Sequence, residues 1–356
     1  MSSKLPLPPS SECQFGTFLL QRSILSSSSS STQKHPPLRI AYSIKRPSLL
    51  RHNAKQEGRH SPVPLIVVHG GPSLPSEYLA PLAHNHHLQN RPIIFYDQLG
   101  CGWSSIPQKD DWYGVLQMSQ DLEELVLHLK DVWKVQEFHL LGHSLGGAIG
   151  FEFLKRQIIQ HNVDENRIRD TPQCLSFILS NASTNFQLSS SEQMRLFQEF
   201  QLQHLQTRMP PTQTQRTKTL NGNDQFFQTH ICRTSTKPAE LVSALSRRGK
   251  EWSAKEYTAL ALARDSIEAA DATYTSADTT DSVRHQFPPA LIIRGQYDFI
   301  TDACTRGWKD LITTMEDVRS DLEEVVMKDC AHYPHFEQPD NYSSEVEAFC
   351  SMSESP

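Results

Sequence analysis

Short apolar segments alternate with helical patterns along most of this 356-residue chain. The apolar segments are rich in Val, Ile, Leu and Phe, as strands buried on both faces are; they span residues 64–68, 92–96, 137–141, 175–179, 290–294 and 322–327. One intervening stretch, residues 119–129, places four apolar side chains on a single helical face: Leu122, Leu125, Val126 and Leu129. This alternation predicts an α/β fold with a mostly parallel sheet covered by helices.

Residues 184–286 interrupt the alternation of strand and helix patterns, because they contain no convincing strand pattern. They are polar and rich in Gln, with helical patterns at 191–203, 238–248 and 254–270. An insertion between two strands of a parallel sheet belongs at the carboxyl ends of the strands, where ligands bind. We therefore predict an inserted helical cap at 184–286, which divides the core into residues 61–183 and 287–356.

The first 60 residues differ in composition from the rest of the chain. They hold nine Lys or Arg and two acidic residues, and residues 26–31 are an unbroken serine run. A basic, serine-rich and acid-poor start is typical of an organelle transit peptide. The pattern favours instead a β-hairpin, in which residues 16–22 pair with 38–44 and the serine run lies in the connection.

Composition narrows the class of function. The net charge of −6 is mild and spread out, which argues against a nucleic-acid partner. No run approaches the roughly 18–20 apolar residues of a spanning helix, so we expect a soluble protein without a membrane partner. We place it in the cytoplasm, with organelle targeting by the N-terminal segment as the alternative. The oligomeric state stays open.

Cysteine and histidine usage argues against a metal site. The seven cysteines are far apart and form no C-x-x-C pair, which suits free thiols in a reducing compartment. His84, His86 and His87 are close in sequence, but they lack the i, i+4 spacing and carboxylate of a helical zinc site. We predict neither a metal nor a cofactor.

The third apolar segment runs into Leu141-Gly-His-Ser-Leu-Gly-Gly-Ala148. This is G-x-S-x-G between a predicted strand and a predicted helix. A serine on such a sharp turn has a strained backbone, and side chains two residues to either side would collide, which explains Gly142 and Gly146. The helix N-terminus also favours developing negative charge. The pattern predicts Ser144 as a nucleophile.

A nucleophilic serine needs a histidine base and a carboxylate that orients the base, in the chain order Ser, Asp or Glu, His for this architecture. Asp298 follows the strand at 290–294 and a glycine turn, and Asp302 is the reserve candidate. His332 lies in the loop directly after the last strand, whereas His335 follows a proline and is expected to begin the next helix. We predict Ser144, Asp298 and His332 as the catalytic residues.

Residues 67–75, Val-Val-His-Gly-Gly-Pro-Ser-Leu-Pro, leave backbone N–H groups exposed after the first apolar segment. With a serine nucleophile, the expected oxyanion donors are the residue after it, Leu145, and this loop. Gly71 is the natural loop donor and Gly70 the next candidate. The glycine patterns of phosphate loops are absent from the sequence. We expect His69 to brace the loop by hydrogen bonds and Glu337 to cap or buttress a helix.

Several motifs together resemble the proline iminopeptidase (prolyl aminopeptidase) branch of the α/β-hydrolase superfamily. They are His69-Gly-Gly-Pro72, Tyr96-Asp-Gln-Leu-Gly-Cys-Gly-Trp-Ser104, Gly142-His-Ser-Leu-Gly146, the acid turn at 295–298 and Asp329-Cys-Ala-His332. The resemblance covers roughly residues 60–350. It implies an α/β-hydrolase fold and the release of N-terminal proline, or another small residue, from peptides or amides.

The predicted cap contains a further similar segment, the aromatic pair and H-x-x-R of residues 226–233. In the family, cap glutamates hold the substrate's α-amino group, and Asp224 is the acidic residue near this segment, so the resemblance implies Asp224 in substrate binding. The chain departs from the family at Ser73 and Leu145, where glycine and an aromatic residue are usual. Two alternatives remain: an esterase, lactonase or small-amide hydrolase with the same triad, or a non-catalytic binding protein on this scaffold.

Overall fold

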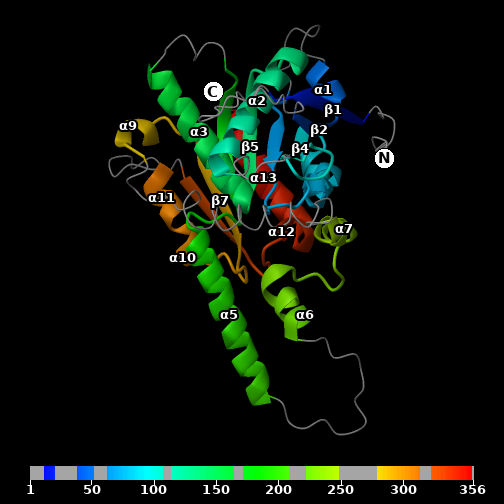
Figure 1. The fold of residues 1–356 in the computed structure, drawn as a ribbon, viewed down its shortest axis with the longest axis vertical. Coiled ribbons are helices and arrows are strands. Elements are labelled where there is room, and N and C mark those ends of the chain that lie inside the picture. Colours follow the sequence, from blue (N-terminus) through cyan, green and yellow to red (C-terminus); the bar gives the residue numbers. More distant parts are fainter. Residues whose placement is uncertain are drawn as a thin grey trace, which may run out of the picture.

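An eight-stranded sheet forms the centre of the molecule (Figure 1). The structure, a computed structural model, describes residues 12–20, 38–51, 62–106, 114–163, 171–207, 222–247, 279–312 and 322–354. The strand order is β1-β2-β4-β3-β5-β6-β7-β8. The strands span Cys13–Leu19 (β1), Arg39–Lys45 (β2), Leu65–Val68 (β3), Ile93–Asp97 (β4), Glu137–His143 (β5), Gln173–Ser180 (β6), Ala290–Gly295 (β7) and Leu322–Met327 (β8).

The strands β3 to β8 are parallel and correspond one by one to the six apolar segments expected from the sequence. Most of their residues are fully buried, β3 along its whole length. The register pairs Val68 with Gly142, and Gly142 in turn with Leu179. The carboxyl ends of β3, β5 and β6 therefore lie together, which brings the loops that follow them to one edge of the sheet.

The N-terminal hairpin extends this sheet on one side. β1 pairs antiparallel with β2 in a register that sets Gly16 opposite Tyr42, and β2 continues antiparallel to β4. The pairing of the two N-terminal strands follows the sequence expectation. The serine run at 26–31 lies outside the described residues.

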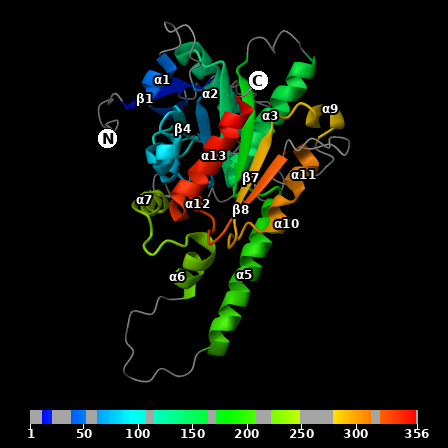
Figure 2. The ribbon, with the colours of Figure 1, turned by 180° about the vertical axis from the view of Figure 1, so that it is seen from behind.

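Helices cover both faces of the sheet, as its apolar strands require. One face packs against α2 (Val115–Trp133) and α3 (Leu145–Val163), together with α9 (Asp281–Arg284) and α11 (Gly307–Ile312). The opposite face, turned toward the viewer in Figure 2, packs against α13 (Pro339–Ser353) and the 3₁₀ helices η2 (Ser76–His84) and η3 (His86–Leu88). The four apolar residues predicted on one face of α2 are all completely buried: Leu122, Leu125, Val126 and Leu129.

A helical insertion separates β6 from β7 in the chain. It includes α5 (Phe186–Thr207), which projects past the end of the sheet (Figure 1), then α6 (Gly222–Phe226), the π-helical turn η5 (Phe227–Ile231) and α7 (Ala239–Arg247). The predicted helices at 191–203 and 238–248 correspond to α5 and α7, and the one at 254–270 lies outside the described residues. The insertion is consistent with the expected cap.

The remaining helices are short: α1 (Pro47–Arg51), α10 (Asp302–Thr305) and α12 (Pro334–Glu337). All seven cysteines are free thiols, as expected. Within the described ranges, no helix combines the length and the apolar character needed to cross a membrane.

Candidate active site

Ser144 occupies the sharp turn between β5 and α3. Its φ angle is +55°, in the left-handed region that side chains disfavour. Its N–H donates to the carbonyl of Ser180 at 2.9 Å, which fixes the turn against β6. A Cβ on Gly142 would lie 2.4 Å from the Gly146 carbonyl oxygen, and one on Gly146 would lie 2.2 Å from that of Val68. Both glycines are therefore required by backbone contacts, as the sequence motif suggested.

His332 and Asp298 meet beside this turn. Nδ1 of His332 lies 3.0 and 3.1 Å from the two carboxylate oxygens of Asp298, and both residues are 4% exposed. The carboxylate also accepts from Asn181 Nδ2 at 2.6 Å and from the Ile300 N–H at 3.0 Å. These donors hold the carboxylate in place, so that it accepts the Nδ1 proton of the imidazole. Nε2 of His332 is then the nitrogen left to act as a base.

One cavity of about 410 Å³ contains Ser144, His332 and Gly71 in its lining. Apolar and aromatic walls come from both the core and the inserted helices: Leu74, Phe299 and Tyr333 from the core, and Phe186, Phe227 and Leu245 from the insertion. Besides Ser144 and the imidazoles of His143 and His332, the polar lining includes the hydroxyl and amide groups of Ser183, Ser189, Ser190 and Gln193. No carboxylate lines the cavity in the part of the chain that the structure describes.

The glycine loop after β3 approaches the nucleophile closely. A Cβ on Gly70 would lie 2.8 Å from Cβ of Ser144. The N–H of Gly70 donates to the hydroxyl of Tyr78 at 2.8 Å, so this donor is already engaged. Gly71, at φ +146°, and Leu145, the first residue of α3, stay the predicted backbone donors. The N–H groups of a helix's first turn have no partner within the helix.

The alternative candidates for the acid and the base, Asp302 and His335, have other partners. Asp302 is half exposed and forms an ion pair with Arg306. His335 is buried, and its Nε2 donates to the carbonyl of Tyr78 at 3.1 Å. Burial lowers the pKa of His335 to about 3, so its ring stays neutral near pH 7. The geometry thus favours the same acid and base as the chain order did.

Two polar residues brace the loops on either side of the site. Glu337 accepts from the N–H groups of Ala331 and Tyr333, at 2.6 and 3.1 Å, and so holds the backbone on either side of His332. Burial raises the pKa of Glu337. His69 accepts from the Gln98 N–H through Nε2 at 2.9 Å, which leaves Nδ1 to donate to the carbonyl of the next residue at 2.8 Å. His69 braces its loop, as expected, whereas Glu337, which was expected to cap or buttress a helix, braces the histidine loop.

The segment 226–233 of the insertion contacts the catalytic loops directly. The carbonyl of Ile231 accepts from the N–H of His332 at 3.0 Å. Nδ1 of His230 donates to the carbonyl of Tyr297, next to the acid, at 2.8 Å. The guanidinium of Arg233 lies 4.0 Å from the centroid of the Tyr297 ring. The H-x-x-R part of this segment therefore joins the insertion to the acid turn and the histidine loop.

Asp224, the residue implied in substrate binding, lies apart from this cavity. It stands on α6 with its side chain 37% exposed and forms an ion pair with Lys237 Nζ at 3.1 Å. It is not among the residues that line the cavity around Ser144. The structure brings together Ser144, Asp298, His332, Gly71 and Leu145, and leaves Asp224 outside.

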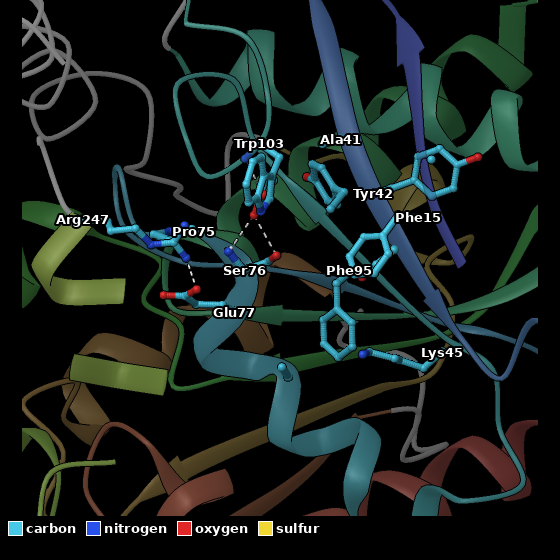
Figure 3. A pocket seen from close by; sticks show the side chains of 15 residues that line it. Phe15, Ala41, Tyr42, Lys45, Pro75, Ser76, Glu77, Phe95, Trp103 and Arg247 are labelled. Atoms are coloured by element: carbon cyan, nitrogen blue, oxygen red, sulfur yellow. Dashed lines mark hydrogen bonds and ion pairs between the residues drawn. The ribbon is translucent and has the colours of Figure 1, made fainter. Parts of the chain in front are cut away.

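A second cavity, of about 220 Å³, lies against the edge strands (Figure 3). Phe15 and Phe95 form its sheet wall, and Trp103 and the Arg247–Glu77 ion pair stand on the other side. It shares no lining residue with the cavity around Ser144. None of the predicted catalytic residues reaches it.

Sequence reasoning missed three residues that the site uses. Asn181, at φ +51°, follows β6 and donates to the acid; its place just past a strand's carboxyl end was an available signal. Tyr78 and His143 form buried hydrogen bonds within the site. His143 lies within the G-x-S-x-G motif, and this position was an available signal. Tyr78 lies in a 3₁₀ helix, and no periodic sequence pattern marked it.

Residues 63–339 match the family described as the alpha/beta hydrolase fold. The chain belongs to this family. Among its relatives is the proline iminopeptidase of Lactobacillus crispatus (strain ST1), 27% identical over 293 residues, or 80% of this chain and 88% of the relative. The proline iminopeptidase of Saccharolobus solfataricus (strain ATCC 35092 / DSM 1617 / JCM 11322 / P2) is 24% identical over 300 residues, covering 80% and 84%. The predicted resemblance to proline iminopeptidases is confirmed.

A solved structure agrees with this alpha/beta hydrolase assignment. The crystal structure of the Mycobacterium smegmatis proline iminopeptidase superposes with a TM-score of 0.61 at 18% identity, covering 89% of this chain and 95% of that one. An identity this low shows the fold alone. The predicted α/β-hydrolase fold is confirmed, and family and relatives together identify a hydrolase.

Proposed function

We propose that this protein is a serine hydrolase of the proline iminopeptidase type, which releases N-terminal proline or another small residue from peptides or amides. One observation carries the proposal: Ser144, at a φ of +55°, opens onto the same cavity as His332, whose Nδ1 lies 3.0 Å from Asp298. The proline iminopeptidases among its relatives support the peptide or amide substrate.

The reaction follows from the roles of these groups. Ser144 Oγ attacks the carbonyl carbon while Nε2 of His332 takes the hydroxyl proton, and His332 then gives that proton to the leaving amine. Asp298 stabilises the imidazolium and fixes the ring through Nδ1. The N–H groups of Gly71 and Leu145 donate to the oxyanion of the tetrahedral intermediate. Water then hydrolyses the acyl-enzyme by the same steps.

The cavity walls suit a small apolar residue. Phe227 and Phe299 line the cavity with aromatic surface. Such a surface suits the pyrrolidine ring of an N-terminal proline, which is bonded to the reacting carbonyl. The hydroxyls of Ser189 and Ser190 are acceptors available to an α-amino group. We propose these contacts for recognition of the first residue of the substrate.

A second function is favoured by one observation. An ammonium group is costly to bury without a paired carboxylate, and no carboxylate lines the described part of the cavity. An ester, lactone or small amide without a free amine needs no such partner. The same triad would then act as an esterase, lactonase or amidase.

The test compares L-prolyl para-nitroanilide, its N-acetylated form and para-nitrophenyl acetate, with wild type and Ser144→Ala. Turnover of the free-amine anilide that is lost on N-acetylation and in Ser144→Ala supports the aminopeptidase. Cleavage of the ester alone, through Ser144, supports the second function. A folded wild type that cleaves none of the three contradicts both and favours the non-catalytic binding protein.

A further inference from the structure

Three buried hydrogen bonds connect the glycine loop to the histidine loop through the residue before the nucleophile. The N–H of Gly70 donates to the Tyr78 hydroxyl at 2.8 Å, and that hydroxyl lies 2.9 Å from Nδ1 of His143. Nε2 of His143 lies 2.8 Å from the carbonyl oxygen of His332. Tyr78 and His143 are each 1% exposed. We call this chain of bonds the Tyr78–His143 bridge.

The bridge has one consistent direction. A carbonyl oxygen only accepts, so Nε2 of His143 carries the proton that it donates to His332. Burial, and the neighbouring rings of His332 and His335, lower the pKa of His143 well below its usual value, which keeps the ring neutral. Nδ1 is therefore an acceptor, and the Tyr78 hydroxyl donates to it. The lone pairs of that hydroxyl remain for the N–H of Gly70.

Packing holds the two side chains in this arrangement. The rings of Tyr78 and His143 meet edge to face at a centroid distance of 5.4 Å, and Tyr333 stacks on His143 at 5.5 Å. The backbone carbonyl of Tyr78 accepts from Nε2 of His335 at 3.1 Å. Aromatic pairs at these distances add to the free energy of burial. The bridge thus has fixed supports at both of its side chains.

Each end of the bridge lies at a reacting group. Gly70 precedes Gly71, the proposed oxyanion donor. The hydrogen bond from the Gly70 N–H to Tyr78 fixes the peptide between His69 and Gly70, one residue before that donor. His143 precedes Ser144, and His332 is the base. Tyr78 comes from η2, outside the strands that supply the other groups. A shift of the oxyanion donor of about 1 Å would cost much of its effect in the transition state.

From this geometry we propose that Tyr78 and His143 are positioning residues, which hold the oxyanion donor and the catalytic base in register with Ser144. The inference rests on the proposed serine-hydrolase function. It adds a tautomer for His143 and a role for Tyr78 that is separate from substrate contact, although Tyr78 also lines the cavity.

The kinetic test is Tyr78→Phe, which removes one hydroxyl and leaves the ring. The matched control is Tyr96→Phe, because the Tyr96 hydroxyl is equally buried and has no hydrogen-bond partner in the described structure. Tyr78→Phe leaves two buried polar groups without a partner, so we expect kcat to fall about ten- to a hundredfold with KM within about twofold. The rate of Ser144 labelling by a fluorophosphonate should fall in parallel, and Tyr96→Phe should match wild type.

Both variants are assayed at a temperature at which circular dichroism shows them folded. A Tyr78→Phe enzyme with kcat within twofold of wild type contradicts the proposal. So does a rise in KM alone, which would make Tyr78 a substrate contact.

A second measurement does not depend on turnover. Nitrogen-15 NMR of labelled histidine should show His143 as the neutral Nε2–H tautomer from pH 8 to pH 6, with a change of its Nδ1 resonance in Tyr78→Phe. An Nδ1–H tautomer or a charged ring at pH 6 overturns the bridge. A wild type that neither turns over nor reacts with the fluorophosphonate contradicts the proposed function, and the NMR result still decides the bridge.

Discussion

The carboxyl end of the sheet and the helical insertion above it are specified in different ways. At the sheet, backbone atoms approach so closely that Gly142 and Gly146 allow no side chain, and Asp298 and His332 stand immediately beyond strands. In the insertion, Phe186 and Phe227 contribute to the cavity by packing, and other apolar side chains could do the same. Residues proposed for the reaction can therefore be predicted from sequence motifs, whereas residues that would recognise the substrate are harder to predict.

The largest effect should come from the sheet side, with Asp298→Asn. The amide cannot stabilise the imidazolium and favours the wrong tautomer of His332, so we expect kcat to fall about 10³- to 10⁴-fold with little change in KM. Asp302→Asn is the control, since Asp302 is half exposed and pairs with Arg306. Steady-state kinetics on the best substrate measure both. Equal losses in the two variants would mean that the acid is misassigned.

The insertion side should respond differently. Phe227→Ala removes aromatic surface from the cavity wall, so we expect KM to rise about tenfold with a smaller change in kcat. Asp224→Asn should leave KM within about twofold, because Asp224 forms an exposed ion pair with Lys237. A large rise of KM in Asp224→Asn, and none in Phe227→Ala, would contradict this expectation. It would support Asp224 as the substrate-binding carboxylate that the resemblance implied.

A smaller effect concerns stability against acid at the sheet side. His335 has a pKa of about 3 in the folded protein, below its ordinary value of 6.5, because it is buried. The unfolded chain therefore binds more protons between these values, so the stabilisation is present above about pH 6.5 and is lost as pH falls toward 3. Urea unfolding at pH 7.5, 6 and 5 should show this decline, with a shallower slope in His335→Gln. An equal decline of stability with falling pH in wild type and His335→Gln would mean that His335 does not cause it.

The sequence predicted the sheet, and singled out the residues of the proposed triad, for physical reasons. Strands buried on both faces are necessarily apolar, so β3 to β7 stood out, and the elbow around Ser144 tolerates few residue types. The order of Ser144, Asp298 and His332 reflects the connectivity of the strands. Alternation of apolar residues likewise predicted the pairing of β1 with β2.

Other features of the site have no such local signal. Asn181 and Tyr78 act through side-chain hydrogen bonds to residues distant in the chain, Asp298 and His143, and no periodic pattern encodes such partners. Asp224 was inferred from its proximity in sequence to the aromatic pair, yet on α6 it is paired with Lys237 at the surface. Side-chain packing decides such positions, and it becomes visible only in three dimensions.

The most direct test of the central claim is the reaction of the folded protein with a fluorophosphonate probe, followed by peptide mass spectrometry. Because Ser144, His332 and Gly71 line one cavity, we predict one adduct per chain, on Ser144. Labelling should be absent in Ser144→Ala and slowed at least about a hundredfold in Asp298→Asn. A folded wild type that stays unlabelled, or that carries the adduct on another residue, would contradict the account.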